Sequence, residues 1–433
     1  MSHGLIDRLL AGTLPDPDGG PPLQVATRSV AIAPSLDGSE ADLVRALDLG
    51  RHLAVVSDGI TREVLGARVE RALSGLGRVT SIVLPGHPHP DDETVERIRS
   101  ASVAADALVA VGSGTINDLC KYASAQDGKP YAVFATAPSM NGYSSVNAAI
   151  TVHGHKQSLT AQAPAGVFLD LSILAAAPKR MIRSGLGDSL CRPTAQADWL
   201  LAHRLLGQPY RTMPFALLAE DEAQLFASPE ALLAGDLEAM ACLVRTLMLS
   251  GFGTAIHGNS QPASQGEHLI SHFADMFGDP GWPFSFHGEQ IGVTTLMMAR
   301  LQERMLDGPP PRLQPNRETE ADFVRRYGEA VGRSCWSEFI RKRPDTTRLA
   351  ELNDRLALAW EAMSEEIGSV TRPASFLREV LRRAGAPMGH EELGWPRPFA
   401  MRALGHARDI RSRYTFLDLA VDSGGIEPIG ALL

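Results

Sequence analysis

The first part of the chain alternates short apolar runs with segments whose apolar residues recur at helical spacing. The apolar runs are residues 53–57, 80–84, 107–111, 131–135 and 166–169. The amphipathic segments between the first four are residues 63–73, 91–104 and 117–125. Short apolar runs are typical of strands buried on both faces, and their alternation with helices predicts a parallel sheet with crossover helices.

From residue 172 the pattern changes to long helical periodicity, and strand patterns are no longer evident. The helical segments are residues 196–206, 229–250, 266–276, 289–304, 318–331, 349–366 and 374–384. A chain of 433 residues is long enough for two cores. We therefore predict an α/β domain at residues 23–171 and an all-α domain at residues 172–433. Residues 1–22, with a short helix at 5–10 and a Pro- and Gly-rich stretch, are expected to form an arm outside the core.

One segment changes period within a few residues. An apolar run ends at Val111, and helical spacing begins at Ile116. Gly112 and Gly114 leave the turn between them with little side chain, so backbone N–H groups at a helix N-terminus can approach a diphosphate closely. The alternative is an ordinary glycine turn, which is favoured when the motif is taken alone because the full G-x-G-x-x-G pattern is absent.

Two further loops follow predicted strands, at Asp58 and at residues 136–139. Because ligands of open α/β sheets bind beyond the carboxyl ends of the strands, these loops and the glycine turn are expected to converge on one crevice. Asp58 is placed to accept a hydrogen bond from an adenosine ribose hydroxyl and to repel a 2′-phosphate, which favours NADH over NADPH.

Charge and cysteine content narrow the class of protein. A net charge of −9 without a dense run of Lys and Arg argues against a nucleic-acid partner. The four cysteines lack C-x-x-C spacing and are expected to be reduced packing residues, as in cytosol. We find no run of about 18 uncharged apolar residues and no signal-peptide pattern, so we expect a cytoplasmic protein without a membrane span.

The helical part contains candidate metal ligands. Asp188 follows a predicted Gly-flanked turn at residues 185–187 and is expected at the start of a helix. His268 and His272 are four residues apart on one helical face, and His287 precedes another helix. One carboxylate and two imidazoles make a three-ligand site for Zn²⁺ or a similar ion, with a position left for substrate. Taken singly, each histidine is better explained as a satisfied polar or surface residue.

These motifs occur in an order that resembles the sn-glycerol-1-phosphate dehydrogenases. That family belongs to the superfamily of iron-containing alcohol dehydrogenases, glycerol dehydrogenases and dehydroquinate synthases. The segments that carry the resemblance are residues 112–121, 136–142, 187–188, 198–199, 266–268, 271–272 and 287–288, and residues 413–419 look like the family's C-terminal signature. The resemblance covers the chain from about residue 50 onward.

The resemblance implies a dehydroquinate synthase-like fold, with a nucleotide-binding parallel-sheet domain and an all-α domain. It implies NAD(H) or NADP(H) bound by Gly112, Ser113, Gly114, Thr115, Ile116, Thr136, Ser139 and Ser145. It implies one divalent metal ion (Zn, Ni or Fe) held by Asp188, His268 and His287. It also implies substrate contacts from Asn141, Asp188 and His272.

The expected activity is a metal-dependent interconversion of dihydroxyacetone phosphate and sn-glycerol 1-phosphate with NAD(P)H, on a small phosphorylated substrate. Asn141 departs from this pattern, because the family usually has Asp at that position. The alternatives are a dehydrogenase of another phospho-ketone or polyol, a dehydroquinate synthase-like cyclase, and an inactive nucleotide-binding homologue. A homo-oligomer is left open.

Overall fold

The computed structural model describes residues 3–152 and 155–424. Contacts divide the chain into two units, the first comprising Met1–Ser189 and Thr212–Ser260 and the second Leu190–Arg211 and Gln261–Leu433. The predicted domain boundary after residue 171 falls inside the first unit, because the long helix α13 (Leu237–His257) packs against α7 (Leu171–Ala175) and the 3₁₀ turn η2 (Asn141–Tyr143).

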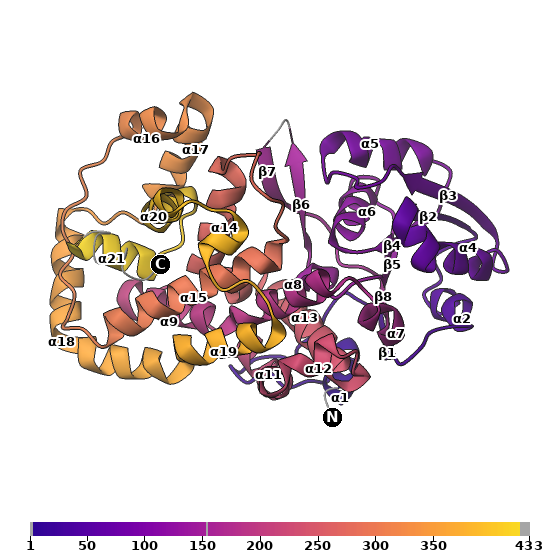
Figure 1. Cartoon of the computed structure of the whole chain (residues 1–433), viewed down its shortest axis with the longest axis horizontal. Helices are drawn as coiled ribbons and strands as arrows, with labels where there is room; N and C mark the ends of the chain where they lie inside the picture. The colour runs from indigo at the N-terminus through magenta and orange to yellow at the C-terminus, as the bar shows by residue number, and fades with distance from the viewer. Residues whose placement is uncertain (1–2, 153–154, 425–433) are drawn as a thin grey trace. The chain divides into compact units, whose positions relative to one another are not determined.

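The first unit is built on a six-stranded parallel sheet of order β1-β8-β5-β4-β2-β3 (Figure 1). Its strands are β1 (Ser29–Ala33), β2 (His52–Asp58), β3 (Arg78–Leu84), β4 (Ala107–Gly112), β5 (Tyr131–Ala135) and β8 (Gly166–Asp170). The five predicted strands are all present, and β4, β5 and β8 are buried throughout, which confirms the α/β fold class. The additional strand β1 was missed because it is a partly exposed edge strand with only one fully buried residue.

Alternate residues of the strands face a core formed with α2 (Glu40–Arg45) and α4 (Ala67–Leu73). Leu53 and Val55 of β2, for example, belong to the same buried cluster as Val69 of α4. Helices α5 (Asp92–Ala101) and α6 (Gly114–Gln126) pack against each other, and α6 contacts β4. Helices can pack against the strands in this way because successive side chains of a strand point to opposite faces of the sheet, so that each buried strand has two apolar faces.

The direction in which the sheet is built reverses between β2 and β4. From β2 the chain passes outward to β3 and then returns to place β4 on the opposite side of β2. Such a switch point leaves a crevice at the carboxyl ends of the two strands, which here end at Asp58 and Gly112. The sheet therefore presents the predicted loops at one edge.

The expectation that residues 1–22 lie outside the core is wrong for their described part. In α1 (His3–Leu10), Ile6 and Leu9 are only 2% and 0% exposed, and Leu14 forms a bridge with Leu23. The Asp18 carboxylate accepts the backbone N–H groups of Thr212 and Met213 at 2.8 and 2.9 Å. Burial of these apolar residues therefore packs the segment against the first unit, although part of it is rich in Pro and Gly.

The remaining elements of the first unit are short helices and one hairpin. They are α3 (Gly59–Thr61), the π-helical turn η1 (Arg62–Gly66), α8 (Lys179–Leu190), α10 (Met213–Ala216), α11 (Ala219–Ala227), α12 (Pro229–Leu233) and the antiparallel pair β6 (Asn147–Val152) and β7 (His155–Thr160). The helix predicted at residues 229–250 is two helices, α12 and α13, because Gly235 between them has a φ of +83°. Among the described residues, α13 alone has the length and apolarity of a membrane span, but 78% of its most apolar window is buried, as in a core helix.

The second unit is helical throughout its described residues. Its α-helices are α9 (Arg192–Leu206), α14 (Gly266–Phe277), α15 (His287–Leu306), α16 (Glu320–Tyr327), α17 (Glu329–Phe339), α18 (Thr346–Val370), α19 (Ala374–Ala384), α20 (Arg397–His406) and α21 (Phe416–Gly424). The core contains Phe273 of α14, Phe323 of α16 and Trp360 of α18. The helix predicted at residues 318–331 is divided into α16 and α17 at Gly328, whose φ is +82°.

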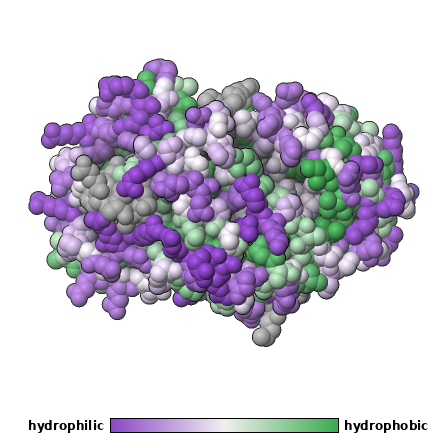
Figure 2. Space-filling view, in the orientation of Figure 1, coloured by the Kyte–Doolittle hydropathy of each residue, from purple (hydrophilic) through white to green (hydrophobic). Residues whose placement is uncertain are grey.

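The surface of the sheet-bearing unit carries exposed apolar residues. Figure 2 shows hydrophobic side chains gathered over the region that Figure 1 draws around the parallel sheet. In the same unit, Ile60, Val64 and Val83 are 57%, 47% and 46% exposed, on α3, η1 and the edge strand β3. All four cysteines are buried, as expected of packing residues.

Gly185 provides a test of the packing around Asp188. The predicted turn at residues 185–187 is wrong, since these residues lie inside α8, and a Cβ on Gly185 would stand 1.8 Å from the carbonyl oxygen of Pro138. Glycine is therefore required here for close packing rather than for a turn. We expect Gly185→Ala to lower the free energy of unfolding by about 1–3 kcal/mol, measured by chemical denaturation.

The matched control is Gly368→Ala in α18, where an added Cβ meets no heavy atom within 4 Å. Alanine is the better helix former by about 1 kcal/mol, so this variant should be as stable as the wild type or more stable. Equal effects of the two substitutions would contradict the packing assigned to Gly185.

Candidate active site

The glycine turn joins the end of β4 to the start of α6. Ser113 is the N-cap residue in extended conformation, and α6 begins at Gly114. A Cβ on Gly112 would lie 2.6 Å from Ile116, and one on Gly114 would lie 3.1 Å from the Met140 side chain. Small residues are therefore needed at both positions. The first N–H groups of a helix have no intrahelical acceptor, so the backbone of Gly114, Thr115 and Ile116 suits a bound diphosphate.

The loop after β5 lies beside this turn. The backbone N–H of Thr136 donates to the carbonyl of Gly112 at 3.1 Å, and the Ser184 hydroxyl donates to the carbonyl of Ser139 at 3.0 Å. Farther along the loop, the backbone N–H of Asn141 donates to Oδ2 of Asp188 at 2.8 Å. The first unit thus brings two predicted cofactor loops and two predicted substrate residues into one hydrogen-bonded region.

The side chain of Asn141 is also held in place. Its Nδ2 donates to the Ser250 hydroxyl of α13 at 3.1 Å. Asp188, at 3% exposure, lies in the last turn of α8, although the sequence predicted it at the start of a helix. Asp58, the other predicted residue of this unit, caps α3 by accepting the N–H of Thr61 at 2.8 Å. Its contact with a ribose stays a prediction.

A buried ion pair that was not among the predicted site residues organises the loop at residues 141–147. The Lys121 ammonium, 0% exposed, donates to the carbonyls of Gly142 and Asn147 at 2.5 and 2.9 Å and to the Ser145 hydroxyl at 3.2 Å. Asp118 lies 3.6 Å from this ammonium. Burial lowers the pKa of Lys121 and raises that of Asp118. The signal available in the sequence is that Asp118 and Lys121 are three residues apart on a predicted helix, so that they lie on one face.

Three imidazoles converge in the second unit. His268 and His272 lie on one face of α14, as their spacing predicted, and His287 is the first residue of α15. The ring centroids are 5.2 Å apart for His268 and His287, 5.9 Å for His272 and His287, and 6.0 Å for His268 and His272. His268 is the most enclosed of the three, at 5% exposure.

The Glu267 carboxylate contacts one of these rings. Its Oε1 lies 2.8 Å from Nδ1 of His268, and Glu267 is 0% exposed. Because a carboxylate only accepts, Nδ1 is the donor in this contact, which in the neutral ring leaves the lone pair on Nε2. Metal-ligating histidines commonly donate their second N–H to a carboxylate in this way. The donor types of the cluster therefore fit a borderline divalent metal, whereas the part of Asp188 as a third ligand stays a prediction.

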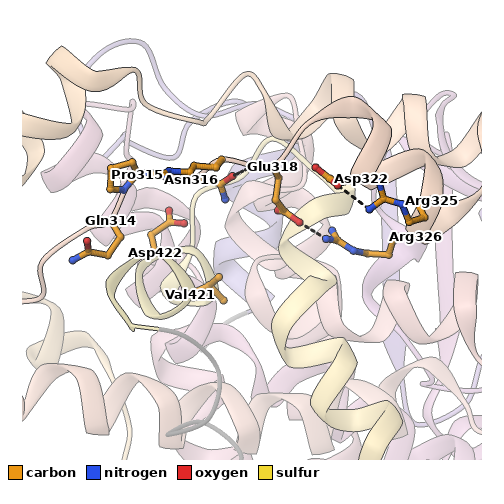
Figure 3. Close-up of a pocket in the computed structure, with 10 residues that line it drawn as sticks. Gln314, Pro315, Asn316, Glu318, Asp322, Arg325, Arg326, Val421 and Asp422 are labelled. Atoms are coloured by element: carbon orange, nitrogen blue, oxygen red, sulfur yellow. Dashed lines mark hydrogen bonds and ion pairs between the residues drawn. The ribbon is translucent and has the colours of Figure 1, made fainter.

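A cavity of about 650 Å³ lies elsewhere in the second unit, between residues 314–326 and α21 (Figure 3). Its acidic and basic side chains pair with one another, as Figure 3 shows for Glu318 with Arg326 and Asp322 with Arg325. None of the residues that line it is a predicted site residue. We therefore base the function on the loop and histidine regions.

The sequence and the fold are similar to those of known dehydrogenases. Residues 31–178 match the family model described as iron-containing alcohol dehydrogenase. The chain is 34% identical over 275 residues to the glycerol-1-phosphate dehydrogenase [NAD(P)+] of Pyrococcus horikoshii, an alignment that covers 63% of this chain and 78% of that one. It is 27% identical over 384 residues to the Bacillus licheniformis enzyme of the same name, covering 87% and 84%.

Among solved structures, the iron-containing alcohol dehydrogenase of Thermococcus thioreducens has a TM-score of 0.60 at 16% identity, covering 94% of this chain and 97% of that one. This likeness confirms the predicted two-part fold, which is that of the iron-containing alcohol dehydrogenases. The chain belongs to the glycerol-1-phosphate dehydrogenase family. The predicted family, and with it the class of NAD(P)-dependent oxidoreductases that use a divalent metal, is confirmed.

The role of Lys121 can be tested by Lys121→Met, which keeps the length of the side chain but removes the ammonium. Two carbonyls and Asp118 then lose a buried partner, which should cost about 3–5 kcal/mol of stability. Because the loop at residues 141–147 is released, NAD(P)H affinity should also fall, as measured by fluorescence titration.

Lys129→Met is the control, since Lys129 also donates to two carbonyls, those of Ser102 and Val103, but not to the loop. It should leave the nucleotide affinity close to that of the wild type. Unchanged affinity in folded Lys121→Met would show that the ammonium does not shape the cofactor site.

Proposed function

We propose that this chain is a metal-dependent oxidoreductase that interconverts dihydroxyacetone phosphate and sn-glycerol 1-phosphate with NAD(P)H. The main support for this proposal is the histidine cluster, in which Glu267 contacts the His268 ring. The cluster occurs in a member of the glycerol-1-phosphate dehydrogenase family. The named relatives favour this activity over a cyclase, a polyol dehydrogenase or an inactive homologue.

In this proposal Asp188, His268 and His287 hold the metal, and the turn at residues 112–116 holds the cofactor diphosphate with Thr136, Ser139 and Ser145 nearby. When bound, the metal supplies a Lewis acid for the substrate oxygen and the nicotinamide supplies or accepts hydride. Asp188 is supported by its burial and by the Asn141 N–H, which orients one of its oxygens.

The protein's own groups orient the substrate and carry the proton. We assign the proton of the alcohol to His272, whose side chain is 32% exposed and whose Nδ1 lies 4.0 Å from Oδ2 of Asp275. A nearby carboxylate stabilises the imidazolium, which suits a group that exchanges protons with solvent. Asn141 is assigned to a substrate hydroxyl, because an amide can both donate and accept there.

Three further assignments belong to the same proposal. Asp58, at the end of β2, favours NADH over NADPH by its charge. The four reduced cysteines fit a cytoplasmic location. The exposed apolar residues near the edge strand β3 are compatible with a homo-oligomer, which stays a prediction.

The decisive experiment is a nicotinamide absorbance assay of the purified protein with Zn²⁺, Ni²⁺ or Fe²⁺. Dihydroxyacetone phosphate should be reduced, and His268→Ala/His287→Ala should lose both the metal, by elemental analysis, and activity down to the level of the no-enzyme control. His89→Ala, which removes an exposed histidine, should change neither quantity. Full metal occupancy in the double variant would refute the assigned ligands.

A substitution at position 141 tests which substrate the protein uses. In Asn141→Asp the Ser250 hydroxyl can donate to the new carboxylate, so the local structure should be retained. For a dihydroxyacetone phosphate enzyme we expect kcat/KM on that substrate to stay within about tenfold of the wild type, while its ratio to other phospho-ketones and polyols changes. Ser250→Ala is the control for loss of the contact alone. Identical ratios for every substrate would show that position 141 does not face the substrate.

A further inference from the structure

We propose that Glu267 is a positioning residue of the metal centre, which holds the His268 ring in the tautomer and orientation that present Nε2 to the metal. This inference rests on the proposed function. Glu267 is not itself assigned as a ligand, and its distance of 2.8 Å from Nδ1 of His268 is the contact on which the proposal depends.

The Glu267 carboxylate has further hydrogen-bond partners besides His268. The Oε1 atom that meets His268 also accepts the backbone N–H of Gln265 at 2.8 Å, and Oε2 lies 3.5 Å from the Thr194 hydroxyl of α9. Glu267 is the second residue of α14, where the helix dipole favours a negative charge. An anion held by a backbone amide and a helix N-terminus can therefore direct a neighbouring imidazole without moving itself.

The start of α14 is anchored in turn. Oδ2 of Asp198 accepts the N–H of Gly266 at 2.9 Å, and a Cβ on Gly266 would lie 2.4 Å from Met298 and 2.8 Å from Asp198. The backbone that carries Glu267 and His268 is thus locked between α9 and α15. Because the ring is 5% exposed and its neighbours are fixed, its orientation is set by the Glu267 contact.

An alternative use of Glu267 is as a metal ligand. Ligand atoms of Cys191, Glu267 and His268 lie within 4.8 Å of one another, and all three residues are buried. A site that used Nδ1 of His268 would require this nitrogen to lose the proton that it donates to the carboxylate at 2.8 Å. The observed contact therefore favours the positioning role, and the two roles predict different spectra.

The test compares Glu267→Gln and Glu267→Leu with the wild type in the full-length protein. Zn²⁺ affinity is measured by competition with a chromophoric chelator, and folding by thermal unfolding of the metal-free protein. We expect Glu267→Leu to weaken Zn²⁺ binding by about 10- to 100-fold. Glu267→Gln keeps a neutral acceptor for Nδ1–H, so it should retain most of the affinity. ¹⁵N-histidine spectra of the metal-free protein should show the Nδ1–H tautomer of His268 in the wild type and lose it in Glu267→Leu.

Asp198→Asn is the matched control, because it alters a buried carboxyl group at the same helix start whose hydrogen-bond donors are all amides. This variant should have a lower unfolding temperature than the wild type but a Zn²⁺ affinity within about threefold of it. A loss of affinity in Glu267→Leu could then not be explained by lower stability alone. Wild-type affinity in folded Glu267→Leu, or an equal loss in both Glu267 variants, would overturn the proposal.

Two outcomes separate this inference from the proposed function. If the Co²⁺-loaded protein shows a thiolate-to-cobalt charge-transfer band that Cys191→Ala removes, the ligand set is the alternative one and the positioning role is overturned. If the wild type binds no metal, the proposed function fails together with the inference. If it binds metal and reduces dihydroxyacetone phosphate, but Glu267→Leu binds Zn²⁺ normally, only the inference fails.

Discussion

The second unit depends on one buried carboxylate, that of Asp198. It accepts the backbone N–H groups of Gly266 and Phe416, each at 2.9 Å, and Nε2 of Gln302 at 3.3 Å. These donors belong to α14, α21 and α15, whereas Asp198 belongs to α9, so a single group joins four helices. Burial and the nearby Glu267 raise the pKa of Asp198 to about 8, in opposition to the N–H donors. These hydrogen bonds hold the start of α14 against α9, whereas the Glu267 contact is the one that bears on the His268 ring.

The first unit also depends on a buried ionisable group, in this case a basic one. Lys121, buried in α6, binds carbonyls on both sides of the loop that carries Ser145, and its partner Asp118 accepts the N–H of Ala149 at 3.0 Å. Desolvation of such groups is costly unless their hydrogen bonds are satisfied. In each unit, therefore, a buried ionisable group with satisfied hydrogen bonds ties a predicted site segment to a helix that is itself part of the core.

The hydrophobic periodicity predicted most of the helices and strands, but not the residues at which some of them end. Five strands of the parallel sheet and the helices α9, α14, α15, α18 and α19 follow from runs of apolar residues, because burial of those faces dominates their folding. The breaks at Gly235 and Gly328 were missed, since one left-handed glycine hardly changes a hydrophobic pattern. Gly185 was taken for a turn, because a glycine required by a neighbouring carbonyl looks the same in sequence as one required by a turn. The histidine cluster was predictable from helical spacing, whereas the Glu267 contact needs a side-chain conformation that spacing does not specify.

Several residues that violate the apolar pattern belong to the predicted site segments or lie beside them. An Asp and a Lys on the buried side of α6, and a Glu and a His in the first turn of α14, weaken those helices as packing elements and would be replaced by apolar residues if stability alone mattered. Each of these groups instead meets a specific partner at hydrogen-bond or ion-pair distance. In this chain, a buried charged side chain with a partner one to three residues away accompanies each of the two predicted site segments, and neither the glycine motif nor the histidine spacing reveals these contacts.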